Sequence, residues 1–339
     1  MHIRYYRCEL TNHQTNIVTS ALIFLKLTFY FLICCLKRKT TINMSSTTEA
    51  DQDEQIDSEP EKQDNSDDKL PKYLKCSYLD AVVGKEIHNY WGNRVLEHTN
   101  SHGEVLALKV SNPDGIDRAQ ADMMHYAATH GVLAPKVRGV YDIVTRRPIA
   151  RVMISERVPG VPLVDIWQNI SEAEQASIKD QLRAQVKKMR TLTQPYIGRI
   201  DKQPTRNIYN TTFVRHCGPF EDEESFDEWC LARLSGGSLQ RWKWKRVLEK
   251  QRRKSTGRFV LTHGDLSPRN IMVDGSTITG IIDWELSGFY PEYVEYAVAI
   301  GLGPGIEEWW VPVLKEVLEP CSADLIKFTE LIEERMGSY

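Results

Sequence analysis

Residues 258–285 read RFVLTHGDLSPRNIMVDGSTITGIIDWE and hold the most informative pattern of the chain. Two apolar, strand-forming runs flank a short polar loop. A turn after Asp265 would return Asn270 to the same side, and a hairpin of IMV and TITGIID would bring Asp283 beside both. Four side chains of this stretch can bind a metal or hold a proton: His263, Asp265, Asn270 and Asp283. The spacing therefore predicts that three oxygen-bearing side chains converge.

This set suits the transfer of a phosphoryl group from ATP. Such a reaction needs a carboxylate at the acceptor hydroxyl and oxygen ligands for Mg²⁺, and it leaves the protein mainly positioning and electrostatic work. Asp265, Asn270 and Asp283 supply these groups. The simpler alternative is a capped turn followed by a surface Asp, which would need no cofactor.

The run HGDLSPRN followed by IIDWE resembles the aminoglycoside phosphotransferase or choline-kinase-like branch of the protein-kinase fold, from residue 71 to about residue 320. The resemblance implies an α+β, two-lobed fold, with a small β-rich N-terminal lobe over residues 71–155 and a larger, mainly helical C-terminal lobe over residues 156–339. Four longer segments resemble fungal members in particular: ERVPGVPL (156–163), QPYIGRID (194–201), GPFEDEESFDEW (218–229) and GFYPEYVEYA (288–297).

The resemblance also implies roles for individual residues. Asp265 is the catalytic base, and Asn270 and Asp283 hold Mg²⁺. Lys109, in LALKV, takes the place of the strand lysine that contacts the phosphates of ATP. His263 is expected to orient the loop rather than to transfer a proton, because Asp265 already occupies the position that faces the acceptor.

A hinge between the two lobes would supply the backbone that meets the adenine of ATP. By the same resemblance this hinge comprises Ser155, Glu156 and Val158. An ordinary linker between lobes fits the same residues, so both interpretations stay open.

Two features depart from the family pattern. Members usually carry a Glu on the small-lobe helix that pairs with the strand lysine, but the matching position holds Gln120. Its amide can accept a hydrogen bond from Lys109 without supplying an opposing charge. Asp117 or Asp122 would substitute if the helix register shifts. Residues 89–104 hold two glycines and no G-x-G-x-x-G, so weak ATP binding or a catalytically dead relative is an alternative.

The acceptor is expected to be a hydroxyl group of a small molecule. Protein kinases carry a Lys two positions after the base, where this chain has Ser267, and a long activation segment, whereas Glu292 follows Asp283 by nine positions. A protein kinase remains an alternative. A cationic acceptor of the aminoglycoside or choline class would want carboxylates and aromatic rings near the base. The candidates, unless they are solvated faces and core aromatics, are Glu292, Glu295, Glu307, Glu308, Trp309 and Trp310.

Periodicity predicts the elements around the central stretch. Strand-forming residues occupy 104–110 and 148–157, and a helix is expected over 118–131. Ser171 and Glu174 form a capping box that opens another helix. The buried stripe of that helix is expected to comprise Ile178, Leu182, Val186, Met189 and Leu192. Further helical stretches are expected near 222–234, 238–254, 292–300 and 306–336.

Composition gives little support to a nucleic-acid partner. The 339 residues carry a net charge of −3, with 41% hydrophobic and 26% charged residues, as in an ordinary folded protein. The stretch 239–258 is basic and holds two tryptophans, which makes nucleic-acid binding a lesser alternative. Its apolar members also fit one buried helical stripe with a basic outer face, so no nucleic-acid partner is expected. This stripe comprises Leu239, Trp242, Val247 and Leu248.

The N-terminal part differs in composition from the rest. Residues 17–36, within an apolar segment over 1–43, form a run of membrane-spanning length, and Lys37–Lys39 would keep the following domain in the cytosol if the run is inserted. Translation from Met44 is the alternative. Residues 44–70 are expected to form a disordered acidic linker. The protein is therefore expected in the cytoplasm, with a membrane partner only if the apolar run is present and inserted.

Overall fold

The computed structural model describes residues 73–74, 77–90, 93–209, 215–234, 237–301 and 307–336. The predictions for residues 1–43 and 44–70 lie outside these ranges. No helix in the described part of the chain combines the length and the apolar character that crossing a bilayer requires.

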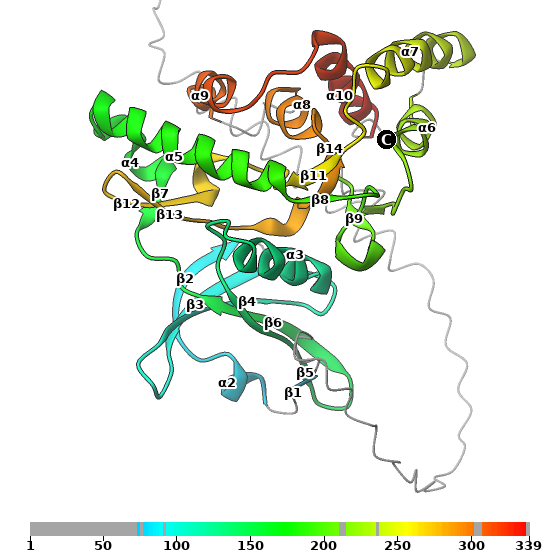
Figure 1. Ribbon diagram of the computed structural model, residues 1–339. Helices are drawn as coiled ribbons and strands as arrows, with labels where there is room; N and C mark the ends of the chain where they lie inside the picture. Colours follow the sequence, from blue (N-terminus) through cyan, green and yellow to red (C-terminus); the bar gives the residue numbers. More distant parts are fainter. Residues whose placement is uncertain are drawn as a thin grey trace, which may run out of the picture. The chain divides into compact units, whose positions relative to one another are not determined.

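The N-terminal part of the described chain is built on a six-stranded sheet in the order β1-β5-β6-β4-β3-β2 (Figure 1). Neighbouring strands pair antiparallel, except that β1 and β5 are parallel. The strands predicted over 104–110 and 148–157 are confirmed as β4 and β6. The six strands are β1 (Tyr73–Leu74), β2 (Lys85–Tyr90), β3 (Asn93–Thr99), β4 (Val105–Ser111), β5 (Val137–Val144) and β6 (Pro148–Glu156).

Alternation along β4 decides where Lys109 points. Leu108 and Val110 are buried with residues of the short helix α2 (Tyr78–Ala81) on one face of the sheet. Successive side chains of a strand point to opposite faces, so Lys109 projects from the other face. Met153, which pairs with Lys109 from the adjacent strand β6, shares that face and belongs to the main buried core.

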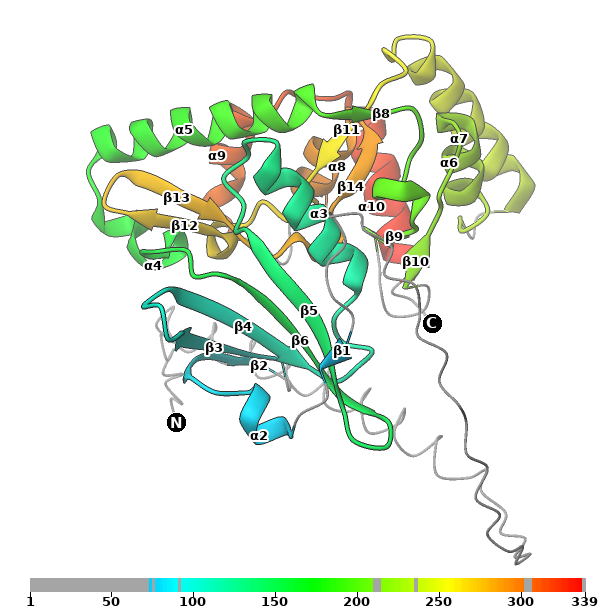
Figure 2. The same ribbon diagram turned by 60° about the horizontal axis from the view of Figure 1, so that its bottom comes forward.

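Helix α3 (Arg118–Thr129) lies between the sheet and the helical part of the chain (Figures 1 and 2). It packs on β5 and on the short 3-10 turn η4 (Trp284–Leu286). Asp117 caps its N-terminus by accepting a hydrogen bond from the backbone N–H of Ala119. The chain leaves the helix through Gly131, whose φ of 82° favours glycine. The predicted helix is confirmed and ends two residues early.

The C-terminal part is mainly helical. Its long helix α5 (Glu172–Thr191) opens with the predicted capping box between Ser171 and Glu174. The stripe predicted for α5 is buried from Ile178 to Met189, whereas Leu192 lies just past the helix and is half-buried. The arrangement confirms the predicted α+β class. The other helices are α4 (Leu163–Ile166), α6 (Glu223–Leu231), α7 (Gly237–Arg252), α8 (Val294–Gly301), α9 (Trp310–Val317) and α10 (Ala323–Met336), with 3-10 turns η1 (Trp167–Asn169), η2 (Ile200–Lys202) and η3 (Pro268–Asn270).

Three small sheets hold the central stretch against these helices. One has the order β14-β11-β8, another β13-β12-β7, and β9 pairs with β10. The predicted hairpin is confirmed, because β12 and β13 pair antiparallel from Ile271–Ile281 to Asp274–Thr277. The strands are β7 (Val161–Pro162), β8 (Thr193–Gln194), β9 (Thr205–Arg206), β10 (His216–Cys217), β11 (Phe259–Thr262), β12 (Ile271–Asp274), β13 (Thr277–Ile281) and β14 (Gly288–Pro291).

The stripe predicted on α7 is wrong in its first half. Leu239 and Trp242 are 76% and 59% exposed, whereas Trp244 and Leu248 face the core. Trp244 packs against Phe328 of α10. Because the helix is docked by its middle and end, its first turn stands clear of the core, and apolar periodicity alone could not show this.

The helical stretch predicted over 306–336 is also corrected. The described residues contain two helices there, α9 and α10. They are separated by residues 318–322, which include Pro320. Proline has no backbone N–H to donate to a continuing helix, so Pro320 prevents α9, which ends at Val317, from running on into α10.

Candidate active site

The loop between β11 and η3 carries Asp265 and is anchored where it begins. The carboxylate of Glu295, on α8, accepts a hydrogen bond from the His263 backbone N–H at 2.6 Å and another from the Gly264 N–H at 3.0 Å. Gly264 has a φ of 83°, and a Cβ at this position would lie 3.0 Å from Leu286. A glycine therefore allows the tight turn, and a buried carboxylate holds the backbone just before Asp265.

The fully buried side chain of His263 links this loop to the residue before Asp283. Its Nδ1 accepts a hydrogen bond from the Asp265 backbone N–H at 3.2 Å. Nε2 therefore carries the ring proton and donates to the Ile282 carbonyl at 3.0 Å. Both ring nitrogens are occupied by backbone groups, which fits the expected orienting role rather than proton transfer.

Asp265 is in direct contact with Asn270, as the predicted turn requires. The Asn270 Nδ2 donates to Asp265 Oδ2 at 2.9 Å and to the Asp265 carbonyl at 3.1 Å. The Arg269 guanidinium lies 2.9 Å and 3.2 Å from the two carboxylate oxygens of Asp265. The Asp265 side chain is 22% exposed, so it can meet an acceptor from solvent. Sequence reasoning missed Arg269, although the spacing of four residues was a signal for this ion pair.

Asp283 directly follows a residue that is bonded to Asn270, because the Ile282 backbone N–H donates to the Asn270 carbonyl at 2.8 Å. Its carboxylate Oδ1 lies 2.8 Å from Lys109 Nζ. The backbone of Asp283 is left-handed, with a φ of 63° and a ψ of 61°. The structure thus brings together Lys109, Asp265, Asn270 and Asp283.

The charges of Lys109 and Asp283 reinforce each other. Burial lowers the pKa of Lys109, but the carboxylates of Asp283 and Glu285 outweigh burial, and the pKa is raised. Burial raises the pKa of Asp283, but the Lys109 ammonium outweighs burial, and the pKa is lowered. Both groups therefore stay charged at neutral pH.

Glu285 adds a further carboxylate that sequence reasoning did not assign. Its Oε2 lies 2.9 Å from Arg206 Nη1. Burial and then the neighbouring Asp283 carboxylate raise the pKa of Glu285. Its place two residues after Asp283 was a signal for a position near the site, but the partner on β9 lies too far along the sequence to be predicted.

The oxygen donors fit Mg²⁺ that is bound together with a nucleotide. Asp283 offers a carboxylate that is 37% exposed, and Asn270 offers an amide oxygen. Within the described ranges, no cluster of three or more His, Cys, Asp or Glu side chains is placed to hold a metal. Mg²⁺ at nucleotide sites usually takes one or two carboxylates, phosphate oxygens and water. A small donor set therefore suits this kind of binding better than an all-protein cage.

Gln120 does not accept a hydrogen bond from Lys109, which corrects the prediction for this helix position. Gln120 is 1% exposed, and its Oε1 has no hydrogen-bond partner in the described part of the structure. The ammonium bonds to Asp283 instead. Lys109 bonds to Asp283 rather than to Gln120 because a charge-assisted hydrogen bond to a carboxylate is stronger than one to an amide.

The two aspartates considered as substitutes also have other partners. Asp117 pairs with Arg199 at 2.6 Å. Asp122 accepts a hydrogen bond from Gln203 Nε2 at 3.3 Å. Both partners come from the segment at η2, so the start of α3 is tied to the helical part of the chain rather than to Lys109.

The expected hinge begins in the last two residues of β6, and many of its polar groups are hydrogen-bonded within the protein. The Glu156 N–H donates to the Lys136 carbonyl at 2.9 Å, and the Arg157 N–H donates to the Val105 carbonyl at 3.2 Å. Ser155 is buried, and its hydroxyl donates to the Glu156 carbonyl at 3.3 Å. The Val158 carbonyl also accepts a hydrogen bond from the Arg157 guanidinium.

Some of the residues considered for a cationic acceptor have partners inside the protein, and others are exposed. Glu292 accepts hydrogen bonds from Arg258 and Thr256. Glu295 binds the backbone of the loop that precedes Asp265. Trp310 is buried and donates to the Leu266 carbonyl at 2.9 Å. Trp309 stacks on Trp167, whereas Glu307 and Glu308 are exposed.

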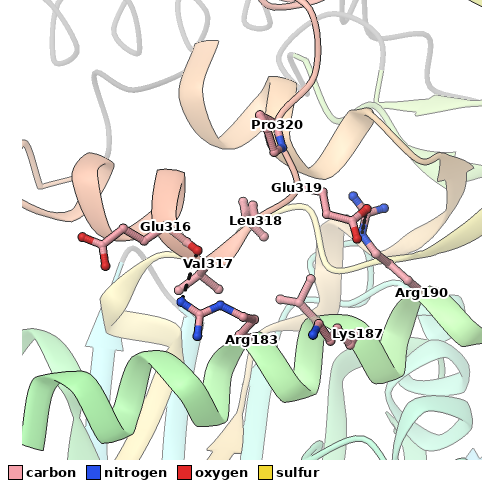
Figure 3. Close-up of a pocket in the computed structure, with 9 residues that line it drawn as sticks. Arg183, Lys187, Arg190, Glu316, Val317, Leu318, Glu319 and Pro320 are labelled. Atoms are coloured by element: carbon pink, nitrogen blue, oxygen red, sulfur yellow. Dashed lines mark hydrogen bonds and ion pairs between the residues drawn. The ribbon is translucent and has the colours of Figure 1, made fainter.

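A cavity of about 180 Å³ lies away from these residues, between α5 and the segment that follows α9 (Figure 3). Its wall is charged, and opposite charges face each other across it. Arg183 donates to the Glu316 carbonyl at 3.3 Å, and Arg190 lies 3.6 Å from Glu319. None of the residues predicted for the site lines this cavity.

Comparison with known proteins gives a family match and similar solved structures. Residues 83–318 match the model of a phosphotransferase enzyme family, APH. No curated protein matches the sequence significantly. A thermostable mutant of aminoglycoside phosphotransferase APH(4)-Ia in its apo form is 15% identical, with a TM-score of 0.48 over 73% of this chain and 83% of that chain. A putative fructosamine-3-kinase from Thermobifida fusca YX-ER1 is 13% identical, with a TM-score of 0.48 over 75% of this chain and 85% of that chain.

The structural similarities are modest, whereas the family match is extensive. It begins before β2 and ends just after α9, and it includes the whole stretch from His263 to Asp283. Since it extends over well over half of the sequence, the chain belongs to the APH phosphotransferase enzyme family.

Proposed function

We propose that this chain transfers a phosphoryl group from ATP, in the presence of Mg²⁺, to a hydroxyl group of a small molecule. The contact of Lys109 with Asp283, beside the bonded pair Asp265 and Asn270, carries the proposal. A capped turn with a surface Asp would not place an ammonium from a distant strand against the same loop.

The proposed roles follow from charge and exposure. Asp265 orients and deprotonates the acceptor hydroxyl, and its bonds to Arg269 and Asn270 fix the direction of its carboxylate. Lys109 remains an ammonium and offers its charge to the phosphates of ATP. Asn270 and Asp283 would hold Mg²⁺, which when bound offsets the negative charge of the phosphates.

Two further groups support these roles without touching the reacting atoms. His263 keeps the loop of Asp265 in register with the residue before Asp283. The stretch from Ser155 to Val158 meets adenine.

A small acceptor is favoured over a protein acceptor by the path of the chain after Asp283. The turn η4 and the strand β14 follow at once, and Phe289 and Tyr290 of β14 are buried. The next helix, α8, begins at Val294. This path leaves little exposed backbone on which a peptide substrate could dock. Hydroxylated compounds of the aminoglycoside and choline classes are therefore the first acceptors to test.

A screen for ADP release with Mg²⁺ and ATP, over classes of hydroxylated small molecules, tests the proposal. Asp265→Asn should reduce turnover by at least about a hundredfold and leave nucleotide affinity nearly unchanged. Asp283→Asn should weaken the binding of Mg²⁺-nucleotide itself by about 10- to 100-fold. Asp274→Asn, at an exposed aspartate at the end of β12, is the matched control and should behave as wild type.

Each outcome decides between named alternatives. Equal turnover in the wild type and in Asp265→Asn would remove the base assignment. Binding of Mg²⁺-nucleotide with no acceptor-stimulated ADP release would favour the catalytically dead relative. Phosphorylation of a peptide but of no small molecule would favour a protein kinase.

A further inference from the structure

Arg199 is a fully buried arginine that bonds to two separate parts of the chain. Its Nη1 donates to Asp117 Oδ2 at 2.6 Å. Its Nε donates to the Ser287 carbonyl at 3.1 Å, and its Nη2 donates to the Glu285 carbonyl at 2.6 Å. A buried cation persists only with such partners, and the planar fork of a guanidinium can satisfy several at once.

One end of this contact is the start of α3. The carboxylate of Asp117 uses Oδ1 to cap the helix at the Ala119 N–H, at 3.1 Å, and it uses Oδ2 to bind Arg199. One carboxylate therefore closes the helix and receives the guanidinium. Movement of the first turn of α3 would break both bonds.

The other end is the loop that begins at Asp283. Glu285 lies in the turn η4, and the Ser287 N–H and hydroxyl both bond to the Trp284 carbonyl, at 3.2 Å and 2.6 Å. A non-glycine residue stays in the left-handed region, as Asp283 does, only where its surroundings hold it there. Lys109 holds the side chain of Asp283, and Arg199 holds the carbonyls that follow it.

Arg199 is itself fixed by the strand that continues from this loop. Its neighbour Gly198 exchanges two backbone hydrogen bonds with Phe289 of β14, at 3.1 Å and 2.7 Å. The Arg199 N–H donates to the Gln203 carbonyl at 2.8 Å. These hydrogen bonds fix the backbone from which the guanidinium extends. A displacement of α3 or of the Asp283 loop is therefore passed through the guanidinium to the other partner.

We propose that Arg199 is a positioning residue for the nucleotide-metal site. It couples the first turn of α3 to the loop of Asp283, and it thereby keeps Asp283 in the geometry that the metal requires. This inference rests on the proposed function for its consequence, but the coupling itself can be measured without nucleotide.

Other charged groups face the same carboxylate and must be controlled. His216 Nε2 lies 3.2 Å from Asp117 Oδ2. The Glu285 side chain does not contribute to the contact, because its carboxylate pairs with Arg206. His216 is 44% exposed. The variant His216→Gln measures how much this second contact of Asp117 contributes to Mg²⁺-ADP binding.

The experiment compares Arg199→Met, Arg199→Lys, Asp117→Asn and the double variant Arg199→Met/Asp117→Asn in the full chain. Titration with ADP is carried out with and without Mg²⁺. Arg199→Met should weaken Mg²⁺-ADP binding by about 10- to 100-fold, as expected for a residue that orients a metal ligand, and should change Mg²⁺-free ADP binding much less. The double variant should be no weaker than Arg199→Met alone, because both changes remove one contact.

The matched control is Arg190→Met. Arg190 is also largely buried, at 12% exposed, and both of its Nη atoms donate to the Glu292 carbonyl at 2.9 Å. This contact involves neither the first turn of α3 nor residues 283–287, so the variant should lose thermal stability without a change in the Mg²⁺ dependence of ADP binding. If Arg199→Met shows only the same behaviour, Arg199 has a structural role alone and the proposal is overturned.

Hydrogen exchange without nucleotide separates this inference from the proposed function. In Arg199→Met and in Asp117→Asn, the backbone amides of residues 284–287 and of the first turn of α3 should both exchange faster than in the wild type. Faster exchange at only one of these places would overturn the coupling. If the coupling is seen but the wild type binds no Mg²⁺-nucleotide, the proposed function fails and the coupling stands. Arg199→Lys, which keeps the charge but not the fork, replaces Arg199→Met if the latter does not fold.

Discussion

The ammonium of Lys109 lies 2.8 Å from the carboxylate of Asp283, although 174 positions separate the two residues in the chain. The two side chains are 21% and 37% exposed. Asp283 raises the pKa of Lys109, and Lys109 lowers the pKa of Asp283, so both groups stay charged. The pair therefore joins the six-stranded sheet to the loop after β13 and keeps one positive and one negative charge at the candidate site.

Lys109→Met should destabilise the protein in a pH-dependent way. We expect the free energy of unfolding at pH 7 to fall by about 1–2 kcal/mol, because a partly buried carboxylate loses its cation, and solvent screening limits the loss. In the wild type the pair's contribution is present above pH about 4 and is lost as pH falls through the lowered pKa of Asp283. In the variant the strongest opposing charge is gone while burial still raises the pKa of Asp283, so the deficit should shrink toward acid pH.

Urea unfolding of the wild type and of Lys109→Met between pH 2.5 and pH 8 measures this deficit. Lys202→Met is the control, because its ion pair with Glu221 is exposed on both sides and should contribute less than about 0.5 kcal/mol. A deficit that stays constant across this pH range would contradict the expected interaction of Lys109 with Asp283.

Glu295→Gln should disturb the catalytic loop. The buried carboxylate accepts hydrogen bonds from two backbone N–H groups, whereas a glutamine would place its amide NH₂ against one of them. We expect a loss of about 2–3 kcal/mol in stability and a fall in turnover. Thermal unfolding and ADP release check both effects. Glu292→Gln is the control nearby on the surface and should cost less than about 1 kcal/mol; an equal cost at both positions would exclude a special role for Glu295.

Asp227 should make stability depend on pH. Burial raises the pKa of Asp227 to about 7, although the contact with Arg252 opposes this. A carboxyl group whose pKa is raised by folding favours the folded state below its unfolded pKa of about 4, and this contribution is lost as pH rises to about 7. The wild type should therefore lose about 2–3 kcal/mol between pH 5 and pH 8, and Asp227→Asn should flatten this profile. Asp274→Asn, at an exposed aspartate that does not act on Asp227, should leave the profile unchanged; a flat wild-type profile would contradict the raised pKa.

The two tryptophans of α7 should differ sharply in stability effect. Trp244→Ala opens a cavity against Phe328 and should cost about 3–5 kcal/mol. Trp242→Ala removes a ring that is 59% exposed and should cost less than about 1 kcal/mol. Urea unfolding of both variants checks the assignment of the two faces. Similar costs at both positions would mean that the face of the helix that carries Trp242 is packed in solution.

Local patterns were sufficient to predict much of the framework. The alternation of LALKV placed Lys109 on a strand, and the capping box at Ser171 marked the start of α5. The hairpin after Asn270 followed from two short apolar runs around a turn. Each of these features depends on residues within about ten positions of one another, where hydrophobic period and turn chemistry determine the outcome.

Long-range partners could not be predicted in the same way. The expected Lys109–Gln120 contact was wrong, because the ammonium finds a carboxylate that approaches from another part of the fold. Glu295 and Arg199 likewise act on distant backbone, and no spacing in the sequence marks either one. On α7, apolar period suggested a stripe that included Trp242, but the docking of the helix left this residue exposed.

The sequence by itself determined the polar set from His263 to Asp283, the strand that carries Lys109 and the family to which the chain belongs, because these depend on fixed spacing over short stretches. Only the tertiary structure decided which carboxylate faces Lys109, what anchors the loop of Asp265, and how α3 is tied to the loop of Asp283. Those pairings join residues far apart in the chain, and they form only when the sheet and the helices pack and bring buried charges within hydrogen-bond distance of a partner.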